Sequence, residues 1–363
     1  MRNSHFLILA SIGLVSVFTA CSTDEDDPVA AGSDNVIRFT AASRLPQNRA
    51  TADITTSNLT QFFVYGYLNS DGSPYMTNVE VNKTGTNVWE YSPVKYWPTG
   101  DALNFYAYAP EGMLPPGTTP LDAVHFTNSG KTDFIYAVSP DMSQPAAGNE
   151  AQVRFNFRHA LARVTVMLSS EDTNMEVKIN NATIVGANQN GDFRFPTVST
   201  SGDIESAGQE SIGTWSNLSG KGFTVLHMAQ RQDEIITLTP EPIDIDTEGD
   251  AAKFFIPQDL PFVQGGDYEN EVYLVLTCAM YDKATGKKIW PNANTPEINL
   301  PNGGLSGEGY IYLSLQGSGF TAWKGGYHYL YNVVINGHPD MSPIEFGNPT
   351  VDKFVTVTTQ LQP

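Results

Sequence analysis

Hydrophobic and polar residues alternate along most of the chain in short segments, a pattern typical of β-strands with one buried face. In residues 37–41, Ile37, Phe39 and Ala41 share one face of the predicted strand. Later segments are rich in β-branched and aromatic residues and end at proline, glycine or aspartate. The clearest of them are residues 61–68, 89–98, 102–110, 133–140, 153–157, 159–170 and 354–361. Long helical periodicity is nearly absent, so the pattern predicts an all-β protein.

The predicted strands fall into two stretches, separated by a turn-rich interval at residues 139–152. Short strands that follow one another at intervals of about 8–12 residues are typical of antiparallel β-sandwiches. We therefore predict two tandem β-sandwich domains with little helix, residues 36–158 and residues 159–363. No repeat of fixed period is visible, which disfavours propellers and solenoids.

Composition agrees with a folded β protein and excludes one class of partner. Of the 363 residues, 40% are hydrophobic and 16% are charged, so the chain has enough apolar side chains for real cores. Its 31 glycines and 23 prolines suit many turns between strands. The formal net charge of −19 repels the phosphates of nucleic acids, so we expect no DNA or RNA partner.

The first residues have the features of an export signal. Arg2 precedes an apolar run at residues 6–18, which is too short to span a bilayer permanently. The run ends in the sequence TAC, which resembles the lipobox of bacterial lipoproteins and whose cysteine is Cys21. This resemblance implies that residues 1–20 are a lipoprotein signal peptide and that acyl chains such as palmitate on Cys21 anchor the protein in the outer membrane. An ordinary secretory signal that contains a cysteine is the alternative.

Residues 21–35 form an acidic tether in this interpretation. The sequence STDEDD resembles the acidic surface-export signal that follows the lipidated cysteine in lipoproteins of Bacteroidetes. The resemblance implies an outer membrane lipoprotein exposed on the cell surface. A solvated linker with no export role has the same composition and is the alternative.

No set of residues forms a catalytic or cofactor site, so we expect no enzyme activity and no cofactor or metal ion. The six histidines match no zinc motif. The sequence DIDTEGD, from Asp244, resembles half of a calcium loop, but Phe255 stands where such a loop needs a glutamate. Ser306 lies in a glycine-rich loop and not in a nucleophile elbow. We interpret Cys278 as a small hydrophobe in a buried strand.

Two groups of aromatic residues, within residues 89–97 and residues 323–331, permit two interpretations. Exposed rings would form a platform for a glycan, and buried rings would belong to a core. Tyr327, Tyr329 and Tyr331 alternate, so they share one face of one predicted strand. Because a sandwich buries such a face, we interpret these aromatic residues as core.

Several segments together resemble the fimbrillin-like proteins, the pilins of type V fimbriae in anaerobic Gram-negative bacteria. The segments are IRFTA, WPTGDALNFYAYAP, FRHALARVTVML, FFIPQ and WKGGYHYLYNVVI. The resemblance covers nearly the whole chain after Cys21. It implies two transthyretin-like β-sandwich domains in tandem, a place in the fimbrium, a role in adhesion, and other fimbrial subunits as partners.

The resemblance also implies a use for two arginines in the loop after the first predicted strand. In this family an Arg-specific protease cuts the lipidated precursor in that loop, which implies cleavage after Arg49 or Arg44. Arg49 is our first choice because it directly precedes the predicted start of the ordered domain. Arg44 is followed by Leu45 and Pro46, and a nearby proline usually hinders access by a protease. Two arginines that only keep the loop soluble are the alternative.

Loss of the first strand would expose an apolar slot and unpaired backbone groups, which a strand of another subunit can fill. Our predicted donor strand is residues 354–361, in which Val355, Val357, Thr359 and Leu361 share one face. The alternative for this segment is an ordinary last strand of its own domain. The alternative for the whole protein is a monomeric surface lipoprotein that binds a glycan or a host ligand.

Overall fold

The structure is a computed structural model in which nearly every regular element is a β-strand. It describes residues 35–41, 54–55, 58–86, 88–144, 152–202, 204, 207–247, 253–263, 268–300, 307–337, 345–346 and 350–353. The helices of these residues are the 3₁₀ turns η1 (Gln209–Ser211), η2 (Gln232–Glu234) and η3 (Glu297–Asn299). Within these ranges, no helix has the length and apolar character needed to cross a membrane. The predicted all-β fold class is confirmed.

Six antiparallel strands form the N-terminal sheet, in the order β4-β3-β2-β5-β7-β9. Their bounds are β2 (Gln61–Leu68), β3 (Pro74–Gly85), β4 (Val88–Tyr91), β5 (Leu103–Ala109), β7 (Ile135–Met142) and β9 (Arg158–His159). Both faces of β2 are buried: Phe62 and Val64 belong to one cluster of core side chains, and Phe63 and Tyr65 belong to another. This two-sided burial explains why the sequence QFFVYGYL is almost continuously hydrophobic.

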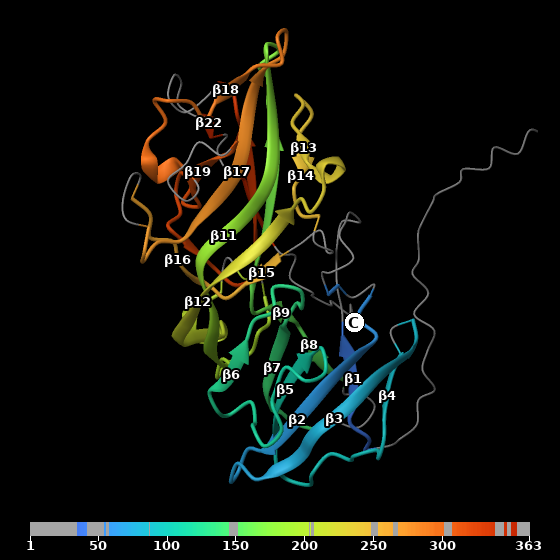
Figure 1. Ribbon diagram of the computed structural model, residues 1–363. Coiled ribbons are helices and arrows are strands. Elements are labelled where there is room, and N and C mark those ends of the chain that lie inside the picture. Colours follow the sequence, from blue (N-terminus) through green and yellow to red (C-terminus); the bar gives the residue numbers. More distant parts are fainter. Residues whose placement is uncertain are drawn as a thin grey trace, which may run out of the picture. The chain divides into compact units, whose positions relative to one another are not determined.

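The strands β1 (Arg38–Ala41) and β8 (Gln152–Phe155) form a separate two-stranded parallel sheet. Their side chains belong to the same core cluster as Phe62, Phe105 and other residues of the N-terminal sheet. The first strand of the chain therefore pairs with a strand more than a hundred residues later, and it closes one side of the N-terminal core (Figure 1).

Three further sheets complete the described part of the chain. The largest has the order β12-β11-β17-β18, with β13 and β6 also paired to β11, and β19 paired to β17. A second has the order β14-β10-β21-β22, with β15 on β10 and β23 on β21, and β16 pairs with β20. Their bounds are β6 (Val124–Thr127), β10 (Ala162–Ser169), β11 (Met175–Arg194), β12 (Thr214–Met228), β13 (Ile236–Thr237), β14 (Ile243–Asp244), β15 (Lys253–Phe255), β16 (Gln258–Asp259), β17 (Tyr273–Asp282), β18 (Lys288–Trp290), β19 (Gly309–Ser314), β20 (Ala322–Trp323), β21 (Tyr327–Val334), β22 (Glu345–Phe346) and β23 (Thr350–Lys353).

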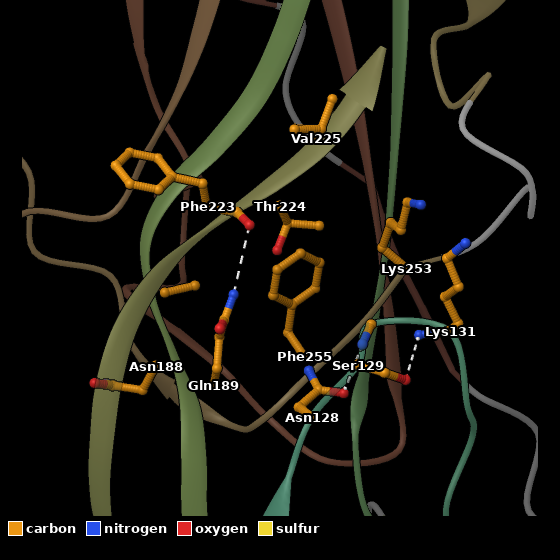
Figure 2. Close-up of a pocket in the computed structure, with 12 residues that line it drawn as sticks. Asn128, Ser129, Lys131, Asn188, Gln189, Phe223, Thr224, Val225, Lys253 and Phe255 are labelled. Carbon is orange, nitrogen blue, oxygen red and sulfur yellow. Dashed lines mark hydrogen bonds between the residues drawn. The ribbon is translucent and has the colours of Figure 1, made fainter. Parts of the chain in front are cut away.

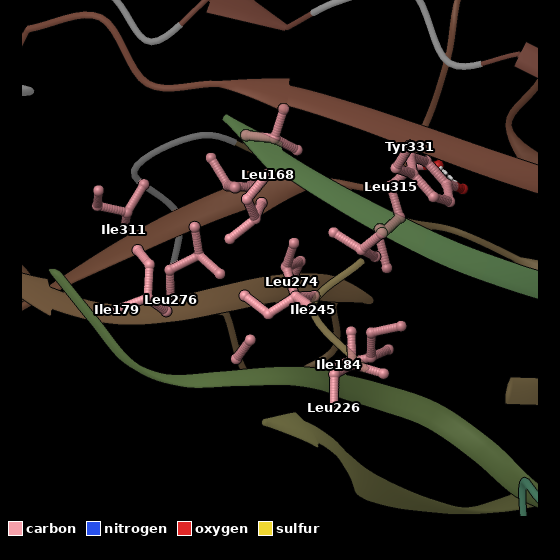
Figure 3. Close-up of a cluster of buried hydrophobic side chains, with 14 of the residues drawn as sticks. Leu168, Ile179, Ile184, Leu226, Ile245, Leu274, Leu276, Ile311, Leu315 and Tyr331 are labelled. Atoms are coloured by element: carbon pink, nitrogen blue, oxygen red, sulfur yellow. Dashed lines mark hydrogen bonds between the residues drawn. The ribbon is translucent and has the colours of Figure 1, made fainter. Parts of the chain in front are cut away.

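The C-terminal core lies between the sheet that contains β11 and the sheet that contains β10. Figure 3 shows Ile184 of β11 and Leu274 of β17 with Leu168 of β10 and Tyr331 of β21 in one cluster of buried side chains. Alternate residues of each strand enter this cluster, as expected for two sheets packed face to face. Strands β10 and β21 run parallel, whereas the other pairs of these sheets are antiparallel.

A third cluster of core side chains crosses the predicted boundary at Arg158. It joins Phe63 and Phe134, which precede the boundary, to Phe193 and Phe254, which follow it. Strand β6 also precedes the boundary and pairs with β11 beyond it. The division into residues 36–158 and residues 159–363 as separate domains stays a prediction.

Candidate functional site

Two successive parts of the first segment have backbone partners, residues 35–37 and the strand β1 that follows them. Residues 38–41 pair with β8, from Arg38 opposite Gln152 to Ala41 opposite Phe155. Just before them, the Ile37 N–H donates to the Lys95 carbonyl at 2.9 Å, and the Trp97 N–H donates to the Asn35 carbonyl at 2.8 Å. The segment therefore lies within a β-structure, as strand exchange requires.

Phe39 anchors the first strand in the N-terminal core. Its side chain is 2% exposed, and Ile37 and Ala41 on the same face are also buried. The Phe39 ring stacks on that of Phe155 and meets the ring of Phe105 edge to face, both at a centroid distance of 5.6 Å. Burial of Ile37 and Phe39 contributes about 1.5–3 kcal/mol each to holding the strand in place. The alternation in the sequence had predicted this buried face correctly.

Tyr91, at the end of β4, holds the first strand through a polar contact. Its hydroxyl donates to the Ile37 carbonyl at 2.8 Å and accepts a bond from the Lys95 N–H at 3.2 Å. Burial raises the pKa of Tyr91 above its ordinary value of 10, so the hydroxyl stays a donor even in mildly alkaline solution. The sequence had not indicated this role, because the segment after Tyr91 was predicted to continue as a strand.

Buried polar atoms near the first strand lack hydrogen-bond partners in the described part of the chain. They are the side-chain oxygens of Asn35 and Thr40 and the indole nitrogens of Trp89 and Trp97. A buried polar group without a partner costs about 1–3 kcal/mol. The first segment therefore makes good apolar contacts with the N-terminal core, but polar atoms of both this segment and its neighbours are left unsatisfied.

The next described residue after β1, Ile54, is bound to buried residues of the N-terminal half. The Ile54 N–H donates to Oδ2 of Asp133 at 2.9 Å, and the same oxygen lies 2.8 Å from Nδ1 of His159. Both Asp133 and His159 are buried. Ala41 and Ile54, the described residues on either side of residues 42–53, are thus both fixed to the N-terminal core.

Most of the other predicted site residues lie outside the described residues. These are Cys21, Arg44, Arg49, Val355, Val357, Thr359 and Leu361. The predicted donor strand directly follows β23, which pairs antiparallel with residues 327–330 of β21. The proposed lipidation, cleavage and donation therefore stay predictions.

The interpretation of the aromatic groups as core is confirmed for most of their members. Trp89, Trp97, Trp323, Tyr329 and Tyr331 are buried. By contrast, the side chain of Tyr96, in the first of the two groups, is 55% exposed. The rings that a glycan platform would need therefore lie mainly inside the protein.

The remaining candidates for chemistry also have structural roles. Cys278 is fully buried, and this burial raises the pKa of its thiol, which keeps it unreactive. Asp246 of the calcium-like segment lies 3.3 Å from the Lys253 ammonium and forms an ion pair with it. Among the described residues, no cluster of His, Cys, Asp or Glu side chains could hold a metal ion.

A family model described as fimbrillin-like matches residues 48–278, which is more than half of the chain. The chain belongs to the fimbrillin-like family. Membership supports a role for this fimbrillin-like protein as a fimbrial component at the cell surface.

Solved structures resemble this fimbrillin-like protein at low sequence identity. A fimbrial protein from Bacteroides vulgatus is 13% identical and has a TM-score of 0.50, over 88% of this chain and 99% of that chain. The tip fimbrial protein Mfa3 from Porphyromonas gingivalis is 11% identical, with a TM-score of 0.38 over 88% of this chain and 98% of that chain. The likeness to the first of these concerns the fold alone. None of the curated protein sequences matches this one.

Proposed function

We propose that this fimbrillin-like protein is a subunit or accessory pilin of a fimbrium that assembles by exchange of its first strand. Cys21 carries the lipid that holds the precursor in the outer membrane. An Arg-specific protease cuts after Arg49 or Arg44, the first strand leaves, and the tail of another subunit takes its place. The observation that carries this proposal is that Ile37 and Phe39 are buried in the N-terminal core while their segment pairs with residues 95–97 and with β8.

The described contacts make the slot suitable for a replacement strand. Removal of β1 exposes the rings of Phe62, Phe105 and Phe155 and frees the backbone groups of β8 that pair with it. An open edge of this kind binds an added strand through main-chain hydrogen bonds and pockets for alternate side chains. Residues 354–361 offer Val355, Val357 and Leu361 for such pockets.

The exchange leads to open filaments. Each subunit would donate its C-terminal segment and accept one at its N-terminal core, so the contact is head to tail. The apolar and ladder contacts add several kcal/mol, offset by the ordering of the free tail at about 1–2 kcal/mol per residue. Slow unfolding of the acceptor core would then keep the polymer intact.

Limited proteolysis with a trypsin-like enzyme, followed by electrophoresis without boiling, tests this proposal. We expect cleavage at Arg49 or Arg44 to produce a ladder of multimers. Val357→Asp abolishes the ladder because it places a charge in an apolar pocket, whereas Thr358→Asp, on the opposite face, leaves it intact. A ladder that survives Val357→Asp would exclude residues 354–361 as the donor, and a cleaved protein that stays monomeric would exclude strand exchange.

The alternative function, a monomeric lipoprotein with an aromatic glycan platform, has less support. Of the rings that would have formed the platform, Trp89, Trp97 and Trp323 are buried. Exposed Tyr96 alone offers too little surface for stacking along a glycan.

A further inference from the structure

A cavity of about 240 Å³ lies beside β11, remote in sequence from the first strand and its partners. Its walls come from β11, β12, β15 and the loop that follows β6 (Figure 2). The volume is below the roughly 300–1,000 Å³ of pockets that hold drug-sized ligands. It therefore suits a ligand of about one sugar ring.

A bulge in β11 shapes one wall of this cavity. Between Val185 and Ala187 the pairing with β12 shifts by one residue, so Gly186 has no partner on that strand. Gly186 has φ of +81°, and a Cβ there would lie 1.9 Å from the Glu271 carbonyl oxygen. Bulges are frequent beside functional sites because they redirect the side chains that follow. Here the redirected residues include Asn188 and Gln189, which line the cavity.

Hydrogen bonds hold the polar lining in place before any ligand binds. The Asn128 amide donates to the Phe254 carbonyl at 2.6 Å, and the Gly130 N–H donates to Oδ1 of Asn128 at 3.0 Å. Opposite this loop, the Asn188 amide donates to Oε1 of Gln258 at 3.1 Å. The Gln189 amide makes only a long 3.5 Å bond to the Phe223 carbonyl, so it is available to a ligand (Figure 2).

The charge of the cavity is opposite to that of the whole protein. The chain has 39 acidic and 20 basic residues, yet the lining contains Lys131 and Lys253 and no acidic residue. Lys253 is buried and its charge is balanced by Asp246 at 3.3 Å. Lys131 is exposed, and no carboxylate of the described residues pairs with its ammonium group. Lys131 thus supplies the net positive charge of the cavity.

An exposed aromatic ring stands at the same cavity. Phe223 is 72% exposed, more than any other large hydrophobic side chain among the described residues. It lines the cavity from β12, opposite the side on which Lys131 and Lys253 lie in Figure 2. An exposed ring of this kind is a common feature of binding sites, because it offers an apolar face to a ligand.

We propose that this cavity binds an acidic sugar, a single pyranose ring that carries a carboxylate. The aliphatic face of the sugar packs on Phe223, its hydroxyl groups bond to the Gln189 amide, and its carboxylate pairs with the Lys131 ammonium. The site is separate from the first strand, so it does not depend on strand exchange. It would give the protein a carbohydrate-binding activity of its own.

Isothermal titration of the whole protein with glucuronate, methyl β-glucopyranoside and acetate tests this proposal. We expect glucuronate to bind about tenfold more tightly than either of the other two, because only glucuronate uses both the ring and the charge. Lys131→Ala removes this preference by weakening glucuronate alone. Phe223→Ala weakens both sugars about fivefold and leaves acetate unchanged. Lys288→Ala and Ile298→Ala, which change an exposed lysine and an exposed apolar side chain elsewhere, bind like the unchanged protein.

Three results would overturn the proposal. The first is the absence of measurable binding of glucuronate at millimolar concentrations by protein whose circular dichroism shows it to be folded. The second is acetate binding as tight as that of glucuronate, which would indicate a simple anion site. The third is unchanged glucuronate binding in both Lys131→Ala and Phe223→Ala, which would place the sugar elsewhere on the protein.

Discussion

The ring of Phe39 in the first strand stacks on the ring of Phe155 in β8, with a centroid distance of 5.6 Å and an interplanar angle of 17°. The two residues are 116 positions apart in the sequence. Their contact joins the only described parallel pair of the N-terminal half, and it fixes the strand that the proposed assembly removes.

Phe39→Ala tests how strongly the first strand supports the N-terminal core. Removal of a fully buried phenylalanine ring leaves a cavity and costs about 3–5 kcal/mol of unfolding free energy. Urea denaturation followed by tryptophan fluorescence measures this change. Tyr96→Ala is the matched control, because Tyr96 is 55% exposed and its loss should alter stability by less than about 0.5 kcal/mol. Equal effects of the two changes would mean that the first strand adds nothing to the stability of this core.

Gly186→Ala tests the bulge in β11. The substitution adds a Cβ that would overlap the Glu271 carbonyl oxygen and places alanine at φ of +81°. We expect a loss of more than about 3 kcal/mol of unfolding free energy, from the clash and the backbone strain together. Gly72→Ala provides the comparison: its φ is +71° but its Cβ would meet nothing within 4 Å, so it should lose only about 1–2 kcal/mol. Similar losses in both variants would contradict the close approach at Gly186.

His328 should make stability depend on pH below neutrality. Burial, with a smaller contribution from the nearby charge of Arg163, lowers the pKa of His328 from 6.5 to about 4. Between about pH 6.5 and pH 4 the unfolded chain therefore binds more protons than the folded protein at this residue. The stability due to neutral His328 is complete above pH 6.5 and falls as pH falls, by about 3 kcal/mol at pH 4.

His328→Gln isolates this effect, since the glutamine amide can still contact the Thr165 hydroxyl that lies 3.0 Å from Nε2 of His328. Urea denaturation of both proteins from pH 7 to pH 4 gives the comparison. We expect the unchanged protein to lose about 3 kcal/mol more than the variant over this range. Parallel pH profiles would show that His328 is protonated as easily in the folded protein as in the unfolded chain.

The sequence predicted the buried face of the first strand but not its partner. Alternation alone identified Ile37, Phe39 and Ala41, because a strand with one buried face has a period of two residues. The strand β8 was itself predicted, as residues 153–157, but its pairing with the first strand leaves no local trace, since parallel pairing across such a long separation has no turn or hairpin signal. The predicted strand at residues 89–98 is shorter in the structure: β4 ends at Tyr91, and Pro93 lacks the N–H that would continue the ladder.

The sugar-binding cavity had no signal in the sequence. Its lining comes from four segments, and neither Lys131 nor Phe223 stands in a recognisable motif. Only the fold brings the exposed ring of Phe223, the weakly bonded amide of Gln189 and the ammonium group of Lys131 together. By contrast, the alternation of Tyr329 and Tyr331 correctly predicted their place in the core, because burial there follows from a local pattern.

The most direct measurement of the central claim is the binding of a synthetic peptide with the sequence of residues 354–363 to the protein after cleavage at Arg49. Native mass spectrometry of the cleaved protein should show one bound peptide in place of the first strand, and the intact protein should bind none. A peptide with aspartate in place of Val357 should also fail to bind. Equal binding to the intact and cleaved proteins, or no binding to either, would contradict the exchange of the first strand for a neighbour's tail.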